Sequence, residues 1–111
     1  MELLVRPTAE RLVVEVMEER IDAASAIAFK DRMREIAGRS AGPVLLDLSR
    51  VRFLDSSGLG AVVAVMKLLG PDRRLELARL TPTVEKVFRL TRMDSIFVIH
   101  DSLPEGLQDV G

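Results

Sequence analysis

Two adjacent serines, Ser56 and Ser57, lie where a strand-like stretch of the sequence meets a long apolar stretch. They belong to the segment Asp55-Ser56-Ser57-Gly58-Leu59-Gly60. Serine is a preferred residue at the start of a helix, because its hydroxyl oxygen accepts a hydrogen bond from a free backbone N–H group. The simplest interpretation is that Ser56 or Ser57 is the N-cap of a helix.

The same position also suits a phosphate. A hydroxyl on a turn at a helix N-terminus is exposed, and a phosphate there would face free N–H groups and the positive end of the helix dipole. Phosphorylation would add a charge of about −1.5 to −2 beside Asp55 without unfolding the domain. A partner that packs on this turn would have to bury or repel that charge. The residue types therefore allow either a plain helix cap or a binary switch.

A serine hydrolase is a third interpretation of Ser56, and the sequence disfavours it. A nucleophile elbow has the pattern Gly-x-Ser-x-Gly, but Leu54 stands where the first glycine would be. The only histidine, His100, would have to act as the base. We predict instead that His100 is a surface histidine at the end of a strand, and that the chain is not an enzyme.

Composition excludes several other kinds of site. The chain has no cysteine and one histidine, which excludes disulfides, thiol nucleophiles, cysteine zinc sites and multi-histidine metal sites within one chain. No P-loop pattern is present, and Val63 stands where a dinucleotide fingerprint would continue after Gly58 and Gly60. We therefore predict no metal and no cofactor.

Length and charge narrow the class of protein. The chain has 111 residues, of which 48% are hydrophobic and 30% charged, and its net charge is −1. These values indicate one globular domain, over residues 1–111. They predict no direct nucleic-acid binding, and the absence of a long apolar run predicts no membrane span. Without cysteines or a recognisable signal peptide, we expect a cytoplasmic location.

Hydrophobic periodicity predicts the elements that position the serines. We expect helices over residues 23–37, 59–69 and from 82 to about 91, the first capped by Asp22. We expect strands over residues 3–6, 12–17, 44–48, 75–80 and 96–99, and a final helical turn from Asp101. The order β-β-α-β-α-β-α-β predicts a single α/β domain with a mixed sheet, antiparallel at its opening hairpin and parallel afterwards.

A resemblance to a known family joins these observations. The stretch 46–60, from Leu46-Asp47-Leu48 to Leu59-Gly60, resembles the signature of the STAS-domain anti-sigma factor antagonists of bacteria. The turn at residues 19–22 and the helix and strand over residues 80–97 are also similar to that family. The resemblance covers about residues 3 to 100 and implies a STAS fold.

The resemblance also implies a mechanism. The serine directly after the motif aspartate, here Ser56, would be phosphorylated by an anti-sigma factor that is itself a serine kinase. The unmodified protein would bind this factor and free a sigma factor. Phosphorylation would end binding, and a PP2C-type phosphatase would restore it. ATP and Mg²⁺ would belong to the kinase. By position, the partner surface would comprise Asp22, Asp55, Ser57, Gly58, Leu59 and Gly60.

One departure from the family pattern affects Asp22. The family has a glycine before the turn, whereas this chain has Glu18 or Glu19 there, depending on the alignment. Asp22 is therefore predicted either to contact a partner or to act only as a helix cap. The main alternative for the whole chain is a STAS scaffold or adaptor, in a signalling or transport assembly, with no phosphorylation switch.

Overall fold

Five strands form one mixed sheet in the computed structural model, which describes residues 1–103. Their order across the sheet is β1-β2-β4-β6-β7, and β3 and β5 form a separate two-stranded sheet. The strands are β1 (Leu3–Pro7), β2 (Leu12–Val16), β3 (Arg20–Ile21), β4 (Val44–Asp47), β5 (Phe53–Leu54), β6 (Leu75–Ala78) and β7 (Val98–His100). The helices are α1 (Ala26–Gly38), α2 (Ser56–Leu69) and α3 (Pro82–Leu90), followed by a 3₁₀ turn at Met93–Ser95.

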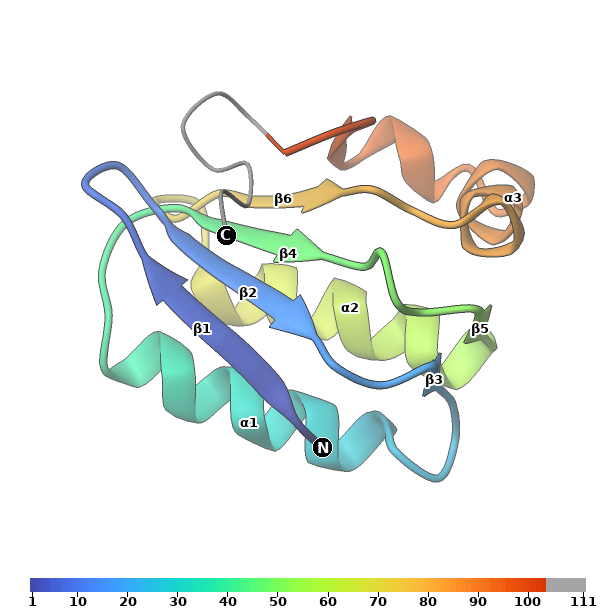
Figure 1. Ribbon diagram of the computed structural model, residues 1–111, viewed down its shortest axis with the longest axis horizontal. Coiled ribbons are helices and arrows are strands. Elements are labelled where there is room, and N and C mark those ends of the chain that lie inside the picture. The colour runs from blue at the N-terminus through green and yellow to red at the C-terminus, as the bar shows by residue number, and fades with distance from the viewer. Residues whose placement is uncertain (104–111) are drawn as a thin grey trace.

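The predicted α/β topology is confirmed. β1 and β2 are antiparallel, and the pairs β2–β4, β4–β6 and β6–β7 are parallel. Helices α1 and α2 lie together on one face of the sheet, and α3 lies beyond the carboxyl end of β6 (Figure 1). The carboxyl ends of the parallel strands therefore point toward the end of the molecule where α2 begins.

The main core lies between the sheet and α1 and α2. Every second residue of the central strands faces these helices, which is the pattern that a covered sheet face produces. Helix α1 buries one apolar stripe, formed by Ala26, Phe29, Met33 and Ile36. Helix α2 buries Leu59, Ala61, Val62, Val65 and Leu69 against the same core. Burial on this scale makes α2 a rigid support for its first turn.

The opposite face of the sheet carries a smaller apolar cluster and a charged one. Val13, Leu45 and Ala78 pack with Leu103. Beside them, the half-buried His100 hydrogen-bonds through Nε2 to Glu76 Oε1 at 2.7 Å. His100 does end its strand as predicted, but its ring faces the sheet surface opposite α1 and α2.

Element boundaries differ from the predictions where local capping competes with periodicity. Helix α1 begins at Ala26 instead of residue 23, because residues 23–25 form a turn closed by Asp22. The last strand begins at Val98 instead of residue 96, because the 3₁₀ turn and its cap occupy the preceding residues. Residues 101 and 102 form a bend and not a helix, and the predicted final helical turn beyond residue 103 lies outside the described residues.

Candidate functional site

The Asp55–Gly60 turn is held in place by the small β3–β5 sheet. Ile21 pairs with Leu54 in parallel register, and both side chains are buried. The backbone N–H groups of Arg52 and Phe53 both donate to the carbonyl oxygen of Glu19. These contacts fasten the chain immediately before α2, so the first turn of the helix starts from a fixed point.

Asp55, not a serine, is the N-cap of α2. Its Oδ1 accepts a hydrogen bond from the Gly58 N–H at 2.9 Å. Its Oδ2 accepts a second one from the Ala23 N–H at 3.2 Å, on the turn before α1. The expectation that Ser56 or Ser57 caps the helix is therefore wrong, because the aspartate one residue earlier already fills that role.

The capping by Asp55 leaves both serine hydroxyls without a structural task. Ser56 and Ser57 are exposed, and within residues 1–103 neither hydroxyl has a hydrogen-bond partner. They stand on the first turn of α2, where backbone N–H groups are not used by the helix. A group added to either oxygen would point into solvent and would face the positive end of the helix dipole.

The three residues after the serines divide into buried and exposed positions. Gly58 and Leu59 are buried, whereas Gly60 is exposed. A Cβ on Gly58 would lie 2.0 Å from the Ile21 carbonyl oxygen, while one on Gly60 would meet nothing within 4 Å. Gly58 therefore allows α2 to approach the backbone of β3, and the prediction that Gly58 and Leu59 line a partner surface stays untested.

Asp22 organises the neighbouring turn. Its Oδ1 accepts hydrogen bonds from the N–H groups of Ala24 and Ser25 at 3.1 and 3.2 Å. The Ser25 hydroxyl donates to the same oxygen and accepts from the Asp22 N–H. Asp22 thus caps the turn at residues 23–25 and not α1 itself, whose N-cap is Ser25. The expectation that Asp22 caps the first helix is therefore wrong, and the half-buried Asp55 links that turn to α2.

Two residues beside this site, Arg20 and Phe53, were not predicted from the sequence. The Arg20 guanidinium lies 4.7 Å from the centre of the Phe53 ring and 3.7 Å, through Nε, from Asp22 Oδ2. The Phe53 side chain is 41% exposed. Exposed aromatic and arginine side chains are enriched at protein interfaces. Phe53 could have been identified from the sequence, since it is a large apolar residue two positions before the polar turn that starts at Asp55.

Ser56 and His100 do not form the arrangement of nucleophile and base that a serine hydrolase needs. His100 lies on the sheet face opposite α2, where it bonds to Glu76. Burial alone would raise the pKa of the Glu76 carboxyl, but the hydrogen bonds from His100 and Arg74 and the charges of Arg11 and His100 outweigh it. The net effect lowers the pKa of Glu76. This cluster is a charged structural network on another face of the molecule.

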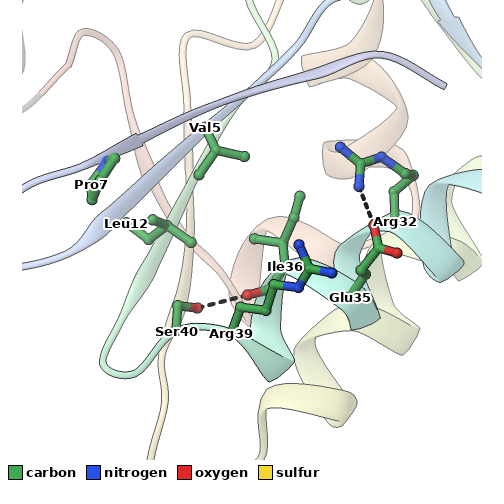
Figure 2. Close-up of a pocket in the computed structure, with 8 residues that line it drawn as sticks. All are labelled: Val5, Pro7, Leu12, Arg32, Glu35, Ile36, Arg39 and Ser40. Atoms are coloured by element: carbon green, nitrogen blue, oxygen red, sulfur yellow. Dashed lines mark hydrogen bonds and ion pairs between the residues drawn. The ribbon is translucent and has the colours of Figure 1, made fainter.

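A hollow of about 370 Å³ lies at the other end of α1, between this helix and β1 and β2 (Figure 2). Val5, Leu12 and Ile36 give it an apolar wall, and Arg32, Glu35, Arg39 and Ser40 give it a polar rim. Arg32 is paired with Glu35, and the Ser40 hydroxyl donates to the Ile36 carbonyl oxygen at 2.9 Å. The lining of this hollow includes neither Ser56 and Ser57 nor the aspartates Asp22 and Asp55.

Two general features of residues 1–103 bear on cofactors and membranes. No group of three or more histidine, cysteine or acidic side chains within this range is placed to hold a metal ion. No helix in the same range is both long and apolar enough to cross a membrane.

Comparison with known proteins identifies a family and several related chains. The STAS domain family model matches residues 2–106. A Thermotoga neapolitana protein, provisionally named an anti-sigma factor antagonist, is 28% identical, with 91% of both chains covered. An anti-sigma factor antagonist from Mycobacterium paratuberculosis has a crystal structure with a TM-score of 0.83 and 27% identity, covering 96% of this chain and 90% of that one. The phosphorylated form of the Bacillus cell-fate determinant SpoIIAA shares the fold, with a TM-score of 0.67, 20% identity and 96% of both chains covered.

Proposed function

The chain belongs to the STAS domain family, and from that premise we propose that it is an anti-sigma factor antagonist switched off by phosphorylation of Ser56. The unmodified protein binds an anti-sigma factor that is also a serine kinase, and so frees a sigma factor. A PP2C-type phosphatase removes the phosphate. All of these steps take place in the cytoplasm.

One observation carries this proposal: the Ser56 hydroxyl is exposed and unbonded on the first turn of a helix that Asp55 caps. Because the fold does not use this oxygen, a kinase can reach it without unfolding α2. The relatives from Thermotoga and Mycobacterium are named as anti-sigma factor antagonists, which supports the same role for this chain.

Electrostatics explain how a phosphate would act. Two carboxylates, Asp22 and Asp55, already lie close to this turn, and Arg20 neutralises part of that charge through Asp22. A phosphate adds about −1.5 to −2 of charge next to them. The helix N-terminus stabilises this charge within the folded domain. A partner that covers the turn must desolvate the phosphate, and each 1.4 kcal/mol of that cost weakens binding about tenfold.

The partner surface of the unmodified protein then consists of its exposed members, Ser57 and Gly60, together with the half-buried Asp22 and Asp55. Gly58 and Leu59 support this surface indirectly. Gly58 lets α2 approach β3 closely, and Leu59 packs in the core. Gly60 carries no side chain, so a partner can approach the α2 backbone closely there.

The test is a capture experiment from lysate of the source cells. The baits are the unmodified protein, Ser56→Ala, Ser56→Glu and, as a matched control at an exposed serine outside the proposed surface, Ser102→Glu. With ADP present, we expect the first two baits to recover a kinase-type anti-sigma factor and Ser56→Glu to recover at least about a hundredfold less, a difference of roughly 2.7 kcal/mol. With ATP present, capture by the unmodified bait should weaken and Ser56 should gain phosphate.

Equal capture by all the baits, with no phosphate gained, would contradict the switch and favour a constitutive adaptor. If ATP added phosphate to Ser57 and none to Ser56, the acceptor would be Ser57 and the role of Ser56 would be wrong. Activity toward activated esters that disappears in Ser56→Ala would instead favour a hydrolase.

A further inference from the structure

We propose that α1 and α2 extend the partner surface away from Ser56 as a basic, apolar strip that receives an acidic amphipathic helix. The strip consists of Ile27, Lys30, Gly60, Ala64, Lys67 and Leu68. This inference rests on the proposed function, because it assigns the chemistry of the segment that the same partner would use.

The strip exposes two large apolar side chains, Ile27 and Leu68, to solvent. Ile27 is 68% exposed and Leu68 is 42% exposed, although both belong to helices whose other faces are buried. Gly60 is also exposed, and Ala64 is half-buried. On α2, Gly60, Ala64, Lys67 and Leu68 follow the spacing of a single helix face. Because Gly60 and Ala64 are small, a partner can make close apolar contact with this face of α2.

A shallow hollow between the two helices provides a place for an anchoring side chain. Its volume is about 30 Å³, and its lining comprises Lys30, Arg34, Ala64, Val65 and Leu68. The apolar part of the lining comes from α2, and both cations come from α1. A hollow of this size and composition fits the tip of one aliphatic side chain with acidic neighbours on either side.

The charges of the strip have one sign. Helix α2 contains no acidic residue between Ser56 and Leu69. Within residues 1–103, neither Lys30 nor Lys67 has an ion-pair partner, and Arg34 pairs with Asp31 at 3.1 Å. The chain as a whole has a net charge of −1, so the positive charge here is local. Its complement is an acidic partner segment.

The strip continues directly from the switch turn. The hydrogen bond from the Ala23 N–H to Asp55 joins the turn before α1 to the start of α2. Ile27 lies in the first turn of α1, Gly60 follows the first turn of α2, and Lys30 and Lys67 lie further along these helices. A partner centred on Ser56 can therefore cover the strip without a gap. An amphipathic helix is the occupant that suits a groove between two packed helices.

The test is nuclear magnetic resonance titration of the ¹⁵N-labelled protein with two synthetic amphipathic peptides. One peptide consists of Leu, Ala and Glu, and the control has Lys in place of every Glu. We expect saturable amide shifts at the strip with the acidic peptide only, weakening as salt is added. Lys30→Glu/Lys67→Glu should weaken this binding about tenfold. Arg39→Glu/Lys86→Glu, which reverses two exposed cations elsewhere, should leave it within about twofold.

Absence of saturable shifts, shifts elsewhere on the protein, or equal binding of both peptides would overturn the inference. Broadening that depends on protein concentration without peptide would identify a second copy as the occupant and would also overturn it. The peptide does not need to reach Ser56, so Ser56→Glu should still bind it. Peptide binding at the strip together with failure of the capture experiment would therefore reject the proposed function and leave the strip intact.

Discussion

The starts of α1 and α2 use the same residue types for opposite purposes. At α1, the Ser25 hydroxyl donates to Asp22 Oδ1 and accepts from the Asp22 N–H, so both of these hydrogen bonds stabilise the turn. At α2, Asp55 accepts the capping bond from Gly58, and the Ser56 hydroxyl is left exposed and unbonded within residues 1–103. A serine beside an aspartate is therefore structural at one helix start and available for chemistry at the other.

The spacing between aspartate and serine explains the difference. Asp22 precedes Ser25 by three residues, which lets the two side chains close one turn between them. Asp55 immediately precedes Ser56, and its carboxylate reaches past both serines to the N–H three residues on. The helix start is then satisfied without a hydroxyl. Three pairs of substitutions test this comparison, from the largest expected change in stability to the smallest, and a fourth experiment tests a distant region.

Gly58→Ala should be the most damaging change at the start of α2. The new Cβ would lie 2.0 Å from the Ile21 carbonyl oxygen, so the helix must shift away from β3. We expect a loss of about 3 kcal/mol in the free energy of unfolding, measured by urea denaturation. Gly60→Ala, where nothing lies within 4 Å, should instead stabilise the protein by up to about 1 kcal/mol. Equal effects of the two changes would contradict this seating of α2.

Asp55→Ala should remove the N-cap of α2, which in the parent protein leaves the hydroxyls of Ser56 and Ser57 without a capping role. The Gly58 and Ala23 N–H groups would lose their acceptor, and we expect a loss of about 1–2 kcal/mol in urea unfolding. Asp55→Asn keeps a capping oxygen and should lose less than half as much. If both variants were as stable as the parent protein, Ser56 or Ser57 would be able to cap the helix, and the contrast with α1 would disappear.

Ser25→Ala and Ser56→Ala form a matched pair. The first removes two hydrogen bonds with Asp22 and should lower the free energy of unfolding by about 1 kcal/mol. The second removes an exposed, unbonded hydroxyl and should change it by less than about 0.5 kcal/mol. Thermal unfolding followed by circular dichroism ranks the two. The opposite ranking would show that the roles of these serines are reversed.

Glu76→Gln tests a region distant from both helix starts. Because the pKa of Glu76 in the folded protein lies below its ordinary value of 4.5, its carboxylate stabilises the fold fully above about pH 4.5. That contribution is lost as the pH falls through the lowered pKa. The variant should therefore lose less stability than the parent between pH 7 and pH 3.5 in urea unfolding. An unchanged pH slope would contradict this, whereas partner capture at pH 7 should be unaffected.

The sheet was predictable because its signals are periodic. Strands such as Val44–Asp47 and the apolar stripe of α1 follow patterns that burial requires, and the order of elements restricts the topology. The two residues each of β3 and β5 are too few to show a period. Their pairing therefore could not be predicted, although it is what holds the start of α2.

The site was predictable in position but not in detail. The segment Asp55–Gly60 identified the polar turn, yet aspartate and serine are about equally good caps, so residue type could not decide between Asp55 and Ser56. The role of Gly58 depends on Ile21, which is far away in sequence. The same holds for Arg20 and Phe53, which meet only because β3 and β5 pair. Contacts between distant segments decide these details.

The most direct test of the central claim is to map phosphate on the protein after incubation with the captured anti-sigma factor and ATP. Peptide mass spectrometry separates Ser25 from Ser56 and Ser57, and fragmentation distinguishes the last two. The account predicts a single phosphate, on Ser56, and none on Ser25, because the Ser25 hydroxyl is bonded to Asp22 whereas the Ser56 hydroxyl is exposed and unbonded within residues 1–103. Phosphate on Ser25, or none on Ser56 while the partner is bound and the kinase is active on another substrate, would contradict it.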